Sequence, residues 1–271
     1  MAIIDLLKEI EEFGRAFAPG TGGAYVSSGY EPSNPGRIYN YRMSIPDPTV
    51  TDNPTNTAVA RGITPNRTTQ PIVRTVGYTE TLMDSQSTTT EHGVTAGASV
   101  TVSSEAGLIF AKVGVEATVS FSYNYTNTNT YTTETSRSWS DSVTITVPPG
   151  YQTSHTFIVQ TGPFTKQAVL ECDITGTAYV NINGPYAGTY RWPIAHVLEY
   201  KGTPNTTRVS NDVSHFTGSG TLTGKMGLQS YVDIVETPLT GRAGQTRRYQ
   251  IPLTGRSGLN IPIFDPVVSL Q

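Results

Sequence analysis

The side chains that most often carry out chemistry in proteins are few in this chain of 271 residues, and they lie far apart. The four histidines are His92, His155, His196 and His215, and none has a spacing typical of a metal site, so we interpret them as surface or packing residues. The single cysteine, Cys172, lies in the strand-like stretch VLECDITG, where a thiol usually packs as a small buried hydrophobe. No G-x-S-x-G elbow, phosphate-binding loop or dinucleotide fingerprint is present. The sequence therefore predicts neither an enzyme nor a protein with a metal or cofactor.

The composition favours strands and turns. Charged residues make up only 14% of the chain, and Ser, Thr, Asn, Gly and Tyr take their place. A formal net charge of −3 gives no basic footprint for nucleic acid and no polybasic patch for an anionic membrane. Electrostatics thus argues against nucleic acid as a partner and names no other.

The most regular pattern is the stretch VGVEATVSFSYNY, which alternates apolar and polar residues with the period of a strand. One face carries Val113, Val115, Ala117, Val119, Phe121 and Tyr123, and the other carries Glu116, Thr118, Ser120 and Ser122. A second alternating run precedes it, with Val94, Ala96, Ala98, Val100 and Val102 on one face and Thr95, Ser99, Thr101 and Ser103 on the other. We therefore predict a hairpin over residues 94–125, with Leu108, Ile109 and Phe110 at an apolar tip.

The apolar face of this hairpin has two interpretations. Around ten residues in each strand match the roughly 9 to 11 of a tilted transmembrane strand. Ser and Thr would then line an aqueous lumen, and several copies would have to close a barrel together, because every backbone group in lipid must be paired. Alternatively, the hairpin packs against the core of a β-sandwich binding protein such as a lectin or adhesin. The small residues and the apolar tip, an exposed patch that a monomer would have to shelter, favour the first interpretation.

The rest of the chain is strand-like except at its start. Ile3, Ile4, Leu7, Ile10 and Phe17 have helical spacing, and the charges between them exclude a secretory signal peptide and a spanning helix. No further helical period is apparent, so we predict an all-β class. Near the other end, PLTGRAG and PLTGRSG form a near repeat around a dibasic pair. Two similar turns explain the repeat, and a protease-accessible tail is the functional alternative, with activation sites at Arg242, Arg247, Arg248 and Arg256.

Several motifs resemble the aerolysin-like β-pore-forming toxins, and within them the epsilon-toxin and mosquitocidal-toxin branch that includes insecticidal crystal proteins of Bacillus. The resemblance covers residues 68–236. It rests on Thr- and Ser-rich strands around the amphipathic hairpin and on five short motifs, which are RSWSD leading into VPPG, FIVQTG, DITGT, HFTGSG and GLQSY.

The resemblance implies an elongated fold of long twisted antiparallel strands. Its parts would be a receptor-binding head (residues 1–67 and about 178–214), a β body (68–93, 126–177 and 215–250), the insertion hairpin (94–125) and a removable tail (251–271). It also implies a protein that binds a target cell, oligomerises and inserts one hairpin per protomer into a barrel pore, with insecticidal action.

The partners implied by the resemblance are a target-cell membrane, a surface receptor that is a glycan or a protein, and further copies of the chain. Whether a second toxin component takes part is left open. The apparent lack of a signal peptide fits the crystal-forming members, which implies a bacterial parasporal inclusion and action at the target membrane. The aromatic residues that we single out for receptor contacts are Tyr25, Tyr30, Tyr39, Tyr41, Tyr186, Tyr190 and Trp192. Packing between short strands is the alternative for each.

Overall fold

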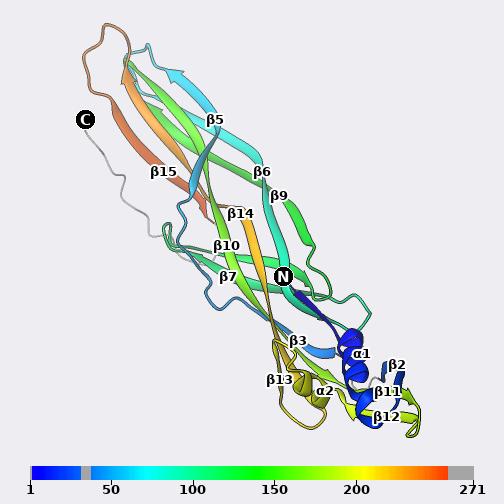
Figure 1. Cartoon of the computed structure of the whole chain (residues 1–271). Helices are drawn as coiled ribbons and strands as arrows, with labels where there is room; N and C mark the ends of the chain where they lie inside the picture. Colours follow the sequence, from blue (N-terminus) through cyan, green and yellow to red (C-terminus); the bar gives the residue numbers. More distant parts are fainter. Residues whose placement is uncertain (1, 32–37, 256–271) are drawn as a thin grey trace.

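The computed structural model describes residues 2–31 and 38–255 and is an elongated, mainly β molecule (Figure 1). The predicted all-β class with one N-terminal helix is confirmed, with one helix added. Two strands run along most of the long axis. They are β10 (Tyr151–Thr175) and β14 (Val213–Pro238), paired antiparallel from Tyr151↔Pro238 to Thr175↔Val213 with one register shift at Gln160/Thr161.

A second long pair lies beside the first. It consists of β6 (Ile72–Thr95) and β9 (Thr130–Val147), paired from Ile72↔Val147 to Thr89↔Thr130. On the outer face of this pair, opposite hydroxyls meet at Thr75–Thr144, Ser87–Thr132 and Thr89–Thr130. The abundance of Thr and Ser in these strands thus reflects cross-strand hydrogen bonding on a solvated face.

The end of the molecule far from the helices is a sandwich of two layers. β5 (Thr55–Pro65) pairs with β10 on one side, and β15 (Arg247–Gly255) pairs with β14 on the other. The β6–β9 pair packs across this layer, and Tyr78 stacks on Phe157 with ring centroids 5.1 Å apart. Side chains alternate between core and solvent along each strand, as the period of two requires. The buried core here consists of Tyr78, Trp139, Val143, Ile145, Val147, Phe157, Val159, Val232 and Ile234.

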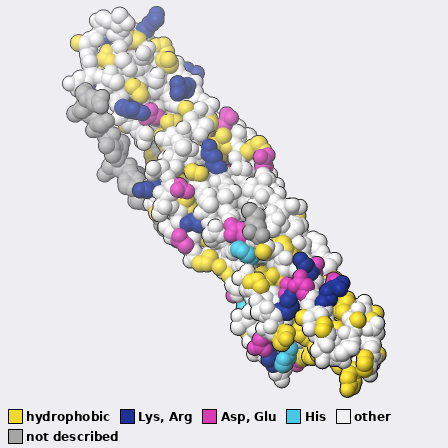
Figure 2. Space-filling view, in the orientation of Figure 1, with side chains coloured by type: hydrophobic (Ala, Val, Ile, Leu, Met, Phe, Trp, Pro, Cys, Tyr) yellow, Lys and Arg dark blue, Asp and Glu magenta, His cyan; other side chains and the backbone are white. Residues whose placement is uncertain are grey.

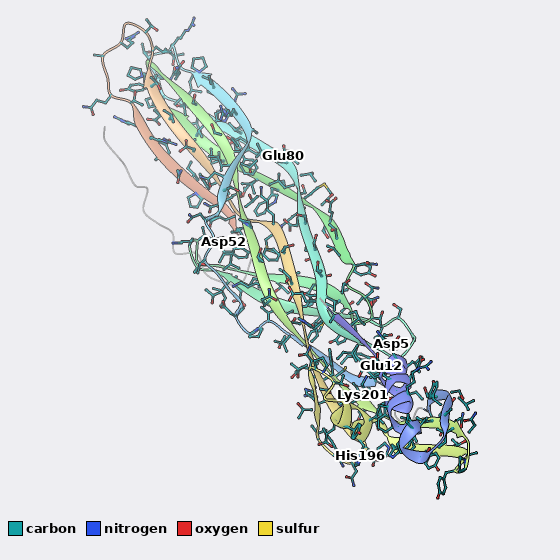
Figure 3. All side chains as sticks on the ribbon, viewed as in Figure 1. Asp5, Glu12, Asp52, Glu80, His196 and Lys201 are labelled. Atoms are coloured by element: carbon teal, nitrogen blue, oxygen red, sulfur yellow. The ribbon has the colours of Figure 1, made fainter. Side chains whose placement is uncertain are left out.

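The opposite end is the head. It holds a three-stranded sheet of β2 (Ala24–Glu31), β11 (Thr177–Asn183) and β12 (Gly188–Pro193), with α1 (Leu6–Phe17), the 3-10 helix η1 (Ala18–Thr21) and α2 (Ile194–Lys201) packed beside it. Short β13 (Thr206–Arg208) pairs with β14. Lys201 and Glu12 point toward one another between the helices (Figure 3), and Lys201 Nζ lies 3.1 Å from Glu9 Oε2. Neither α-helix of the described residues is long and apolar enough to cross a membrane.

Two helical expectations need correction. The predicted helix begins only at Leu6, because Asp5 accepts the Leu7 N–H at 3.0 Å and caps it, while Ala2–Asp5 forms β1 parallel to the end of β6. Helix α2 was not expected. Its buried residues Ile194, Ala195, Val197 and Leu198 share one face, but the helix has only eight residues and exposed Tyr200 places a large ring on the other face, so the apolar period is short and weak.

The structure also divides the chain differently from the resemblance. The resemblance assigns residues 1–67 to the head, whereas β5 lies in the distal sandwich beside residues 152–161 of β10. Residues 38–44 form β3 (Ile38–Ser44), which pairs with β10 nearer the head. The resemblance places residues 251–271 in a tail, whereas 251–255 continue β15. The pairings of β5 and β3 with β10 join residues at least 87 positions apart (152 − 65), so local sequence patterns do not reveal them.

Candidate functional site: a hairpin on the face of the long sheet

The predicted hairpin exists with a shifted register. It consists of β7 (Thr101–Phe110) and β8 (Val115–Asn124), paired from Phe110↔Val115 to Thr101↔Asn124. The turn is residues 111–114, where the N–H groups of Val113 and Gly114 donate to Phe110 O and Gly114 takes φ 65°. With the two-residue strand β4 (Thr49–Val50), the hairpin forms a three-stranded sheet separate from the long one.

The first strand and the tip therefore differ from the prediction. Val94 and Thr95 end β6, and residues 96–100 connect it to β7 through Gly97, whose φ of 89° interrupts extended structure. In this connection Ala96 is buried, Val100 is half-buried, and Ala98 and Ser99 are exposed. Leu108, Ile109 and Phe110 lie within β7 and not at the turn. Ser104 interrupts the apolar face of β7, which is why the alternation of 101–110 was missed.

The two faces of the hairpin differ sharply in burial. In β8 the odd residues Val115, Ala117, Val119, Phe121 and Tyr123 are all at most 4% exposed, and Leu108 and Phe110 of β7 join them in the main core. Val102 is half-buried on the same face, and Val113 packs against the core from the turn. The outer face carries Thr101, Ser103, Glu105, Gly107, Ile109, Glu116, Thr118, Ser120 and Ser122. In this structure the apolar face therefore meets the protein's own sheet.

Aromatic rings hold the hairpin on the sheet. Phe110 lies so close to Gly162 of β10 that a Cβ there would be 2.7 Å from its ring, and Tyr123 lies in the same way over Gly220 of β14. The Tyr123 hydroxyl is buried without a hydrogen-bond partner, and burial raises the pKa of Tyr123 above its usual range. At the end of β8, the Tyr125 hydroxyl donates to Arg42 O of β3 at 2.7 Å.

The outer edge of β7 is held by the short segment that contains β4. Ile109 N–H donates to Pro48 O and Ala111 N–H donates to Val50 O, both at 3.0 Å. Lys166 of β10 fixes this segment, with Nζ 3.3 Å from Asp47 Oδ2 and a further bond to Thr49 O. The Thr49 N–H and Lys166 together hold the pKa of Asp47 below its ordinary value.

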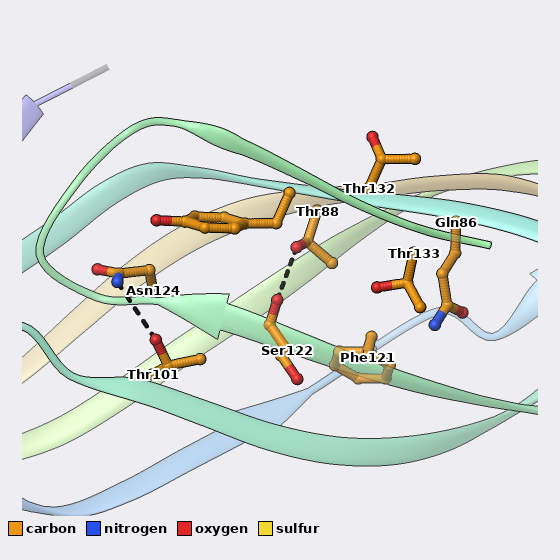
Figure 4. Close-up of a pocket in the computed structure, with 9 residues that line it drawn as sticks. Gln86, Thr88, Thr101, Phe121, Ser122, Asn124, Thr132 and Thr133 are labelled. Atoms are coloured by element: carbon orange, nitrogen blue, oxygen red, sulfur yellow. Dashed lines mark hydrogen bonds between the residues drawn. The ribbon is translucent and has the colours of Figure 1, made fainter.

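The outer edge of β8 faces β6. Side chains from β6 donate to backbone oxygens of β8, with Thr88 Oγ1 2.6 Å from Ser122 O and Thr90 Oγ1 2.7 Å from Asn124 O. Gln86 Nε2 makes the corresponding bond to Ser120 O. A cavity of about 180 Å³ opens between these strands and β9, lined by polar side chains and two aromatic rings (Figure 4).

The aromatic residues singled out for receptor contacts do not form one surface. Tyr30 is buried, and Tyr25, Tyr39, Tyr41, Tyr190 and Trp192 are half-buried, leaving Tyr186 at 68% exposure. Tyr41 packs edge-on against Tyr125, whereas Tyr190 and Trp192 stack on each other beside Phe13 and Phe17 of α1. Hydrophobic side chains gather at the head end of the molecule (Figure 2). Tyr200 and Val26 of the head are also exposed, and no pattern in the sequence marks them.

The residues considered for chemistry lie apart. Among the described residues, no group of three or more His, Cys, Asp or Glu side chains could hold a metal ion. Burial raises the pKa of Cys172 to about 12, so this thiol is protonated and inert. His155 accepts or donates one hydrogen bond with Tyr78 at 2.8 Å, and burial lowers its pKa.

The arginines proposed as cleavage sites have different surroundings. Arg242 is exposed in the turn before β15. Arg247 and Arg248 lie within β15, where Arg248 contacts Asp233 at 2.9 Å and Arg247 lies 3.9 Å from Glu236. Arg256 lies outside the described residues.

The chain is similar to known proteins in sequence and in fold. Residues 28–248 match the family described as Clostridium epsilon toxin ETX/Bacillus mosquitocidal toxin MTX2. The pesticidal crystal protein Cry15Aa of Bacillus thuringiensis subsp. thompsoni is 32% identical over 145 residues, which cover 45% of this chain and 43% of that protein, less than half its length.

Two solved structures share the architecture over nearly the whole chain. A non-toxic crystal protein from Bacillus thuringiensis is 34% identical with a TM-score of 0.81, covering 89% of this chain and all of that one. Cry23Aa1, solved as a binary complex with Cry37Aa1, gives 26% identity and a TM-score of 0.80, covering 94% of this chain and 98% of the matched chain.

Proposed function

Since this chain belongs to the ETX/MTX2 family of aerolysin-like β-pore-forming toxins, we propose that it permeabilises target membranes by releasing the β7–β8 hairpin. Each protomer would contribute one hairpin to a barrel closed by several copies, because a single hairpin leaves its edges unpaired in lipid. The proposal agrees with the absence of enzyme motifs noted from the sequence.

The observation that carries the proposal is a two-faced hairpin with little strand pairing to the body. Its inner face is apolar throughout β8, and its outer face is hydroxyl-rich with Glu105 and Glu116 as the charges of the two strands. It pairs with the body through two-residue β4 alone, not through the long sheet. The same faces suit lipid outside and water inside a barrel.

The head supplies the target in this proposal. Exposed Tyr186, Tyr200 and Val26 offer contacts for a surface receptor, whether glycan or protein. The pesticidal relative supports an insect target, and the crystal-protein relatives support storage in a parasporal inclusion before action at the cell surface. The binary complex of the Cry23Aa1 relative makes a second component worth adding to assays.

A tethered hairpin tests the mechanism. Thr49 and Ile109 are neighbours in the parallel pair of β4 and β7, where strands lie about 4.8 Å apart, so Thr49→Cys with Ile109→Cys can form a disulfide between hairpin and body. The matched control is Glu105→Cys with Ser120→Cys, which joins β7 to β8 within the hairpin. Native Cys172 is buried and does not compete.

The measurement is conductance across a planar lipid bilayer, before and after brief trypsin treatment, with and without reductant. We expect discrete steps from the unmodified chain and the control, and none from the tethered variant until the disulfide is reduced. Conductance by the oxidised tethered variant would contradict insertion of this hairpin.

A second function is favoured by the 34% identical relative that is described as non-toxic. In this alternative the hairpin never leaves its sheet, and the protein is a non-lytic β-sandwich module that binds a carbohydrate or protein. Binding to target cells without conductance from any form, including the reduced and trypsin-treated chain, would support this alternative over the pore.

A further inference from the structure

In the part of β6 that lies under the hairpin, both edges of the strand are already paired. Residues 85–89 of β6 pair with β9 on one edge and β14 on the other. A strand with two neighbours has its N–H and C=O groups engaged in the plane of the sheet. The hairpin therefore lies across this sheet and cannot join it by backbone pairing.

The edge of β8 toward β6 nevertheless carries backbone oxygens that need partners. Tyr125 N–H donates to Val100 O at 2.9 Å, so the odd residues of this arm exchange backbone bonds with the β7 arm. By the alternation of an antiparallel pair, the carbonyls of Ser120, Ser122 and Asn124 point away from β7. Left unpaired and buried, each would destabilise the docked hairpin.

Alternate side chains of β6 meet these oxygens one by one. Gln86, Thr88 and Thr90 donate to the carbonyls of residues 120, 122 and 124, each 34 positions further along the chain. Thr88 and Thr90 are at most 4% exposed, so water does not compete for their bonds. The three bonds form a side-chain ladder where a backbone ladder is impossible.

Resting on the proposed function, we propose that this side-chain ladder is the latch that keeps the hairpin docked until insertion. The side-chain ladder gives the backbone carbonyls at the edge of β8 hydrogen-bond donors. It does so without adding the hairpin to the sheet in which β6 pairs with β9 and β14. Release breaks these three side-chain bonds together with the β4–β7 bonds at the other edge of the hairpin, and it leaves the pairing of β6 with β9 and β14 intact. In a barrel, the freed carbonyls would accept N–H groups from the neighbouring copy. These side-chain bonds then add to the barrier that the buried apolar face of the hairpin already sets.

The test removes two hydroxyls without changing side-chain volume. Thr88→Val with Thr90→Val deletes two latch bonds, and Thr89→Val is the matched control, since the Thr89 hydroxyl pairs with Thr130 on the opposite face at 2.7 Å. Each full-length variant also carries Ala117→Cys, a reporter 3% exposed on the inner face of β8. Alkylation at position 117 in solution measures hairpin release, and dye efflux from phosphatidylcholine vesicles measures insertion.

We expect alkylation at position 117 to accelerate roughly 5- to 30-fold in the double variant, the effect of losing two neutral hydrogen bonds, and to change little in Thr89→Val. Amide exchange of residues 140–147 in the distal sandwich should stay unchanged, because only the hairpin opens. Dye efflux should accelerate in parallel.

Other results overturn the latch. Equal alkylation in the double variant and in Thr89→Val would show that the ladder does not hold the hairpin, and a parallel rise in exchange of residues 140–147 would show general destabilisation. Faster alkylation with unchanged efflux from an active protein would show that the ladder does not limit insertion. Faster alkylation with no efflux from any form contradicts the proposed function and leaves the docking role of the ladder standing.

Discussion

The ring of Tyr123 lies directly over Gly220, so that a Cβ added to this glycine would stand 2.4 Å from Tyr123 Cε1. The hairpin thus docks on β14 at a position where only glycine leaves room. The HFTGSG motif, whose second glycine is Gly220, therefore has a packing role in addition to its place in a strand.

Enlarging this position should disturb the docked hairpin. We expect Gly220→Ala to lower the free energy of unfolding by about 1–3 kcal/mol, as overpacking in a core does. Gly77→Ala is the control, because a Cβ at Gly77 meets nothing within 4 Å. Urea denaturation of both variants measures the difference. Equal midpoints would mean that Tyr123 has space to shift.

The outer face of the hairpin predicts the selectivity of a pore. Glu105 and Glu116 are the charged residues of β7 and β8, so each copy would bring two carboxylates and no cation to the lumen wall. We expect pores to prefer cations, and Glu105→Gln with Glu116→Gln to reduce this preference.

Reversal potentials in a salt gradient measure the preference, and Glu80→Gln, in the body strand β6, is the control. An unchanged reversal potential in the double variant would remove these two side chains from the lumen.

Trypsin should cut first after Arg242, which lies in an exposed turn, and slowly at Arg248, whose guanidinium binds Asp233 through two bonds of 3.1 and 2.9 Å. Cleavage after Arg242 alone should leave β15 bound, since it remains paired with β14. We therefore expect activity to rise only when β15 dissociates.

Mass spectrometry of the digest, combined with size-exclusion chromatography, follows both events. Asp233→Asn should speed cleavage at Arg248 and release of the strand. Full activation by the first cut, with β15 still bound, would contradict a blocking role for this strand.

The pH dependence of stability should reflect His215, whose Nδ1 lies 2.8 Å from Asp173 Oδ1. The hydrogen bond to Asp173 raises the pKa of His215. Burial opposes ionisation of Asp173, but hydrogen bonds from His215 and Asn40 outweigh it and lower the pKa of that carboxyl. Because the pKa of His215 is higher in the folded than in the unfolded chain, protonated His215 stabilises the fold fully at pH values below its unfolded pKa of 6.5. This contribution is lost as the pH rises through the folded pKa of His215. Ionised Asp173 likewise stabilises the fold fully at pH values above its unfolded pKa of 3.8. This contribution is lost as the pH falls through the lower, folded pKa of Asp173.

The difference in Tm between the unmodified chain and His215→Gln should therefore be largest between these two values, about 2–4 °C, and shrink at alkaline pH. The lowered pKa of His155 makes the fold less stable as the pH falls. Because the unmodified chain and His215→Gln both contain His155, this effect cancels in the difference between their Tm values. A difference that grows with rising pH would contradict the pairing.

The sequence predicts the parts of this fold that repeat locally. The alternation from Val115 to Tyr123 identifies β8 correctly, because a strand between core and solvent records both environments in a period of two. The alternation does not identify β7, because polar Ser104 lies on its apolar face and Gly107 lies on its polar face. The turn at 111–114 contains Lys112 and Gly114, ordinary turn residues that the neighbouring apolar run obscured.

The remaining features depend on contacts between distant segments. The pairing of β5 with β10 and the ladder from Thr88 and Thr90 to β8 leave no periodic mark, since a threonine in a strand serves many purposes. The receptor aromatics show the same limit, because Tyr30 and Tyr186 have similar surroundings in sequence and opposite exposure in the fold.

The β10–β14 pair runs from the head to the distal sandwich, so one long strand ladder joins the two ends of the molecule. A pull along the long axis of a molecule fixed by its head would load this ladder in shear, with all interstrand bonds sharing the force. The hairpin can instead be peeled away bond by bond. In a single-molecule stretching experiment the hairpin should detach at low force, while the β10–β14 pair keeps its length. One fold thus combines a stiff spacer with a compliant element mounted on its side.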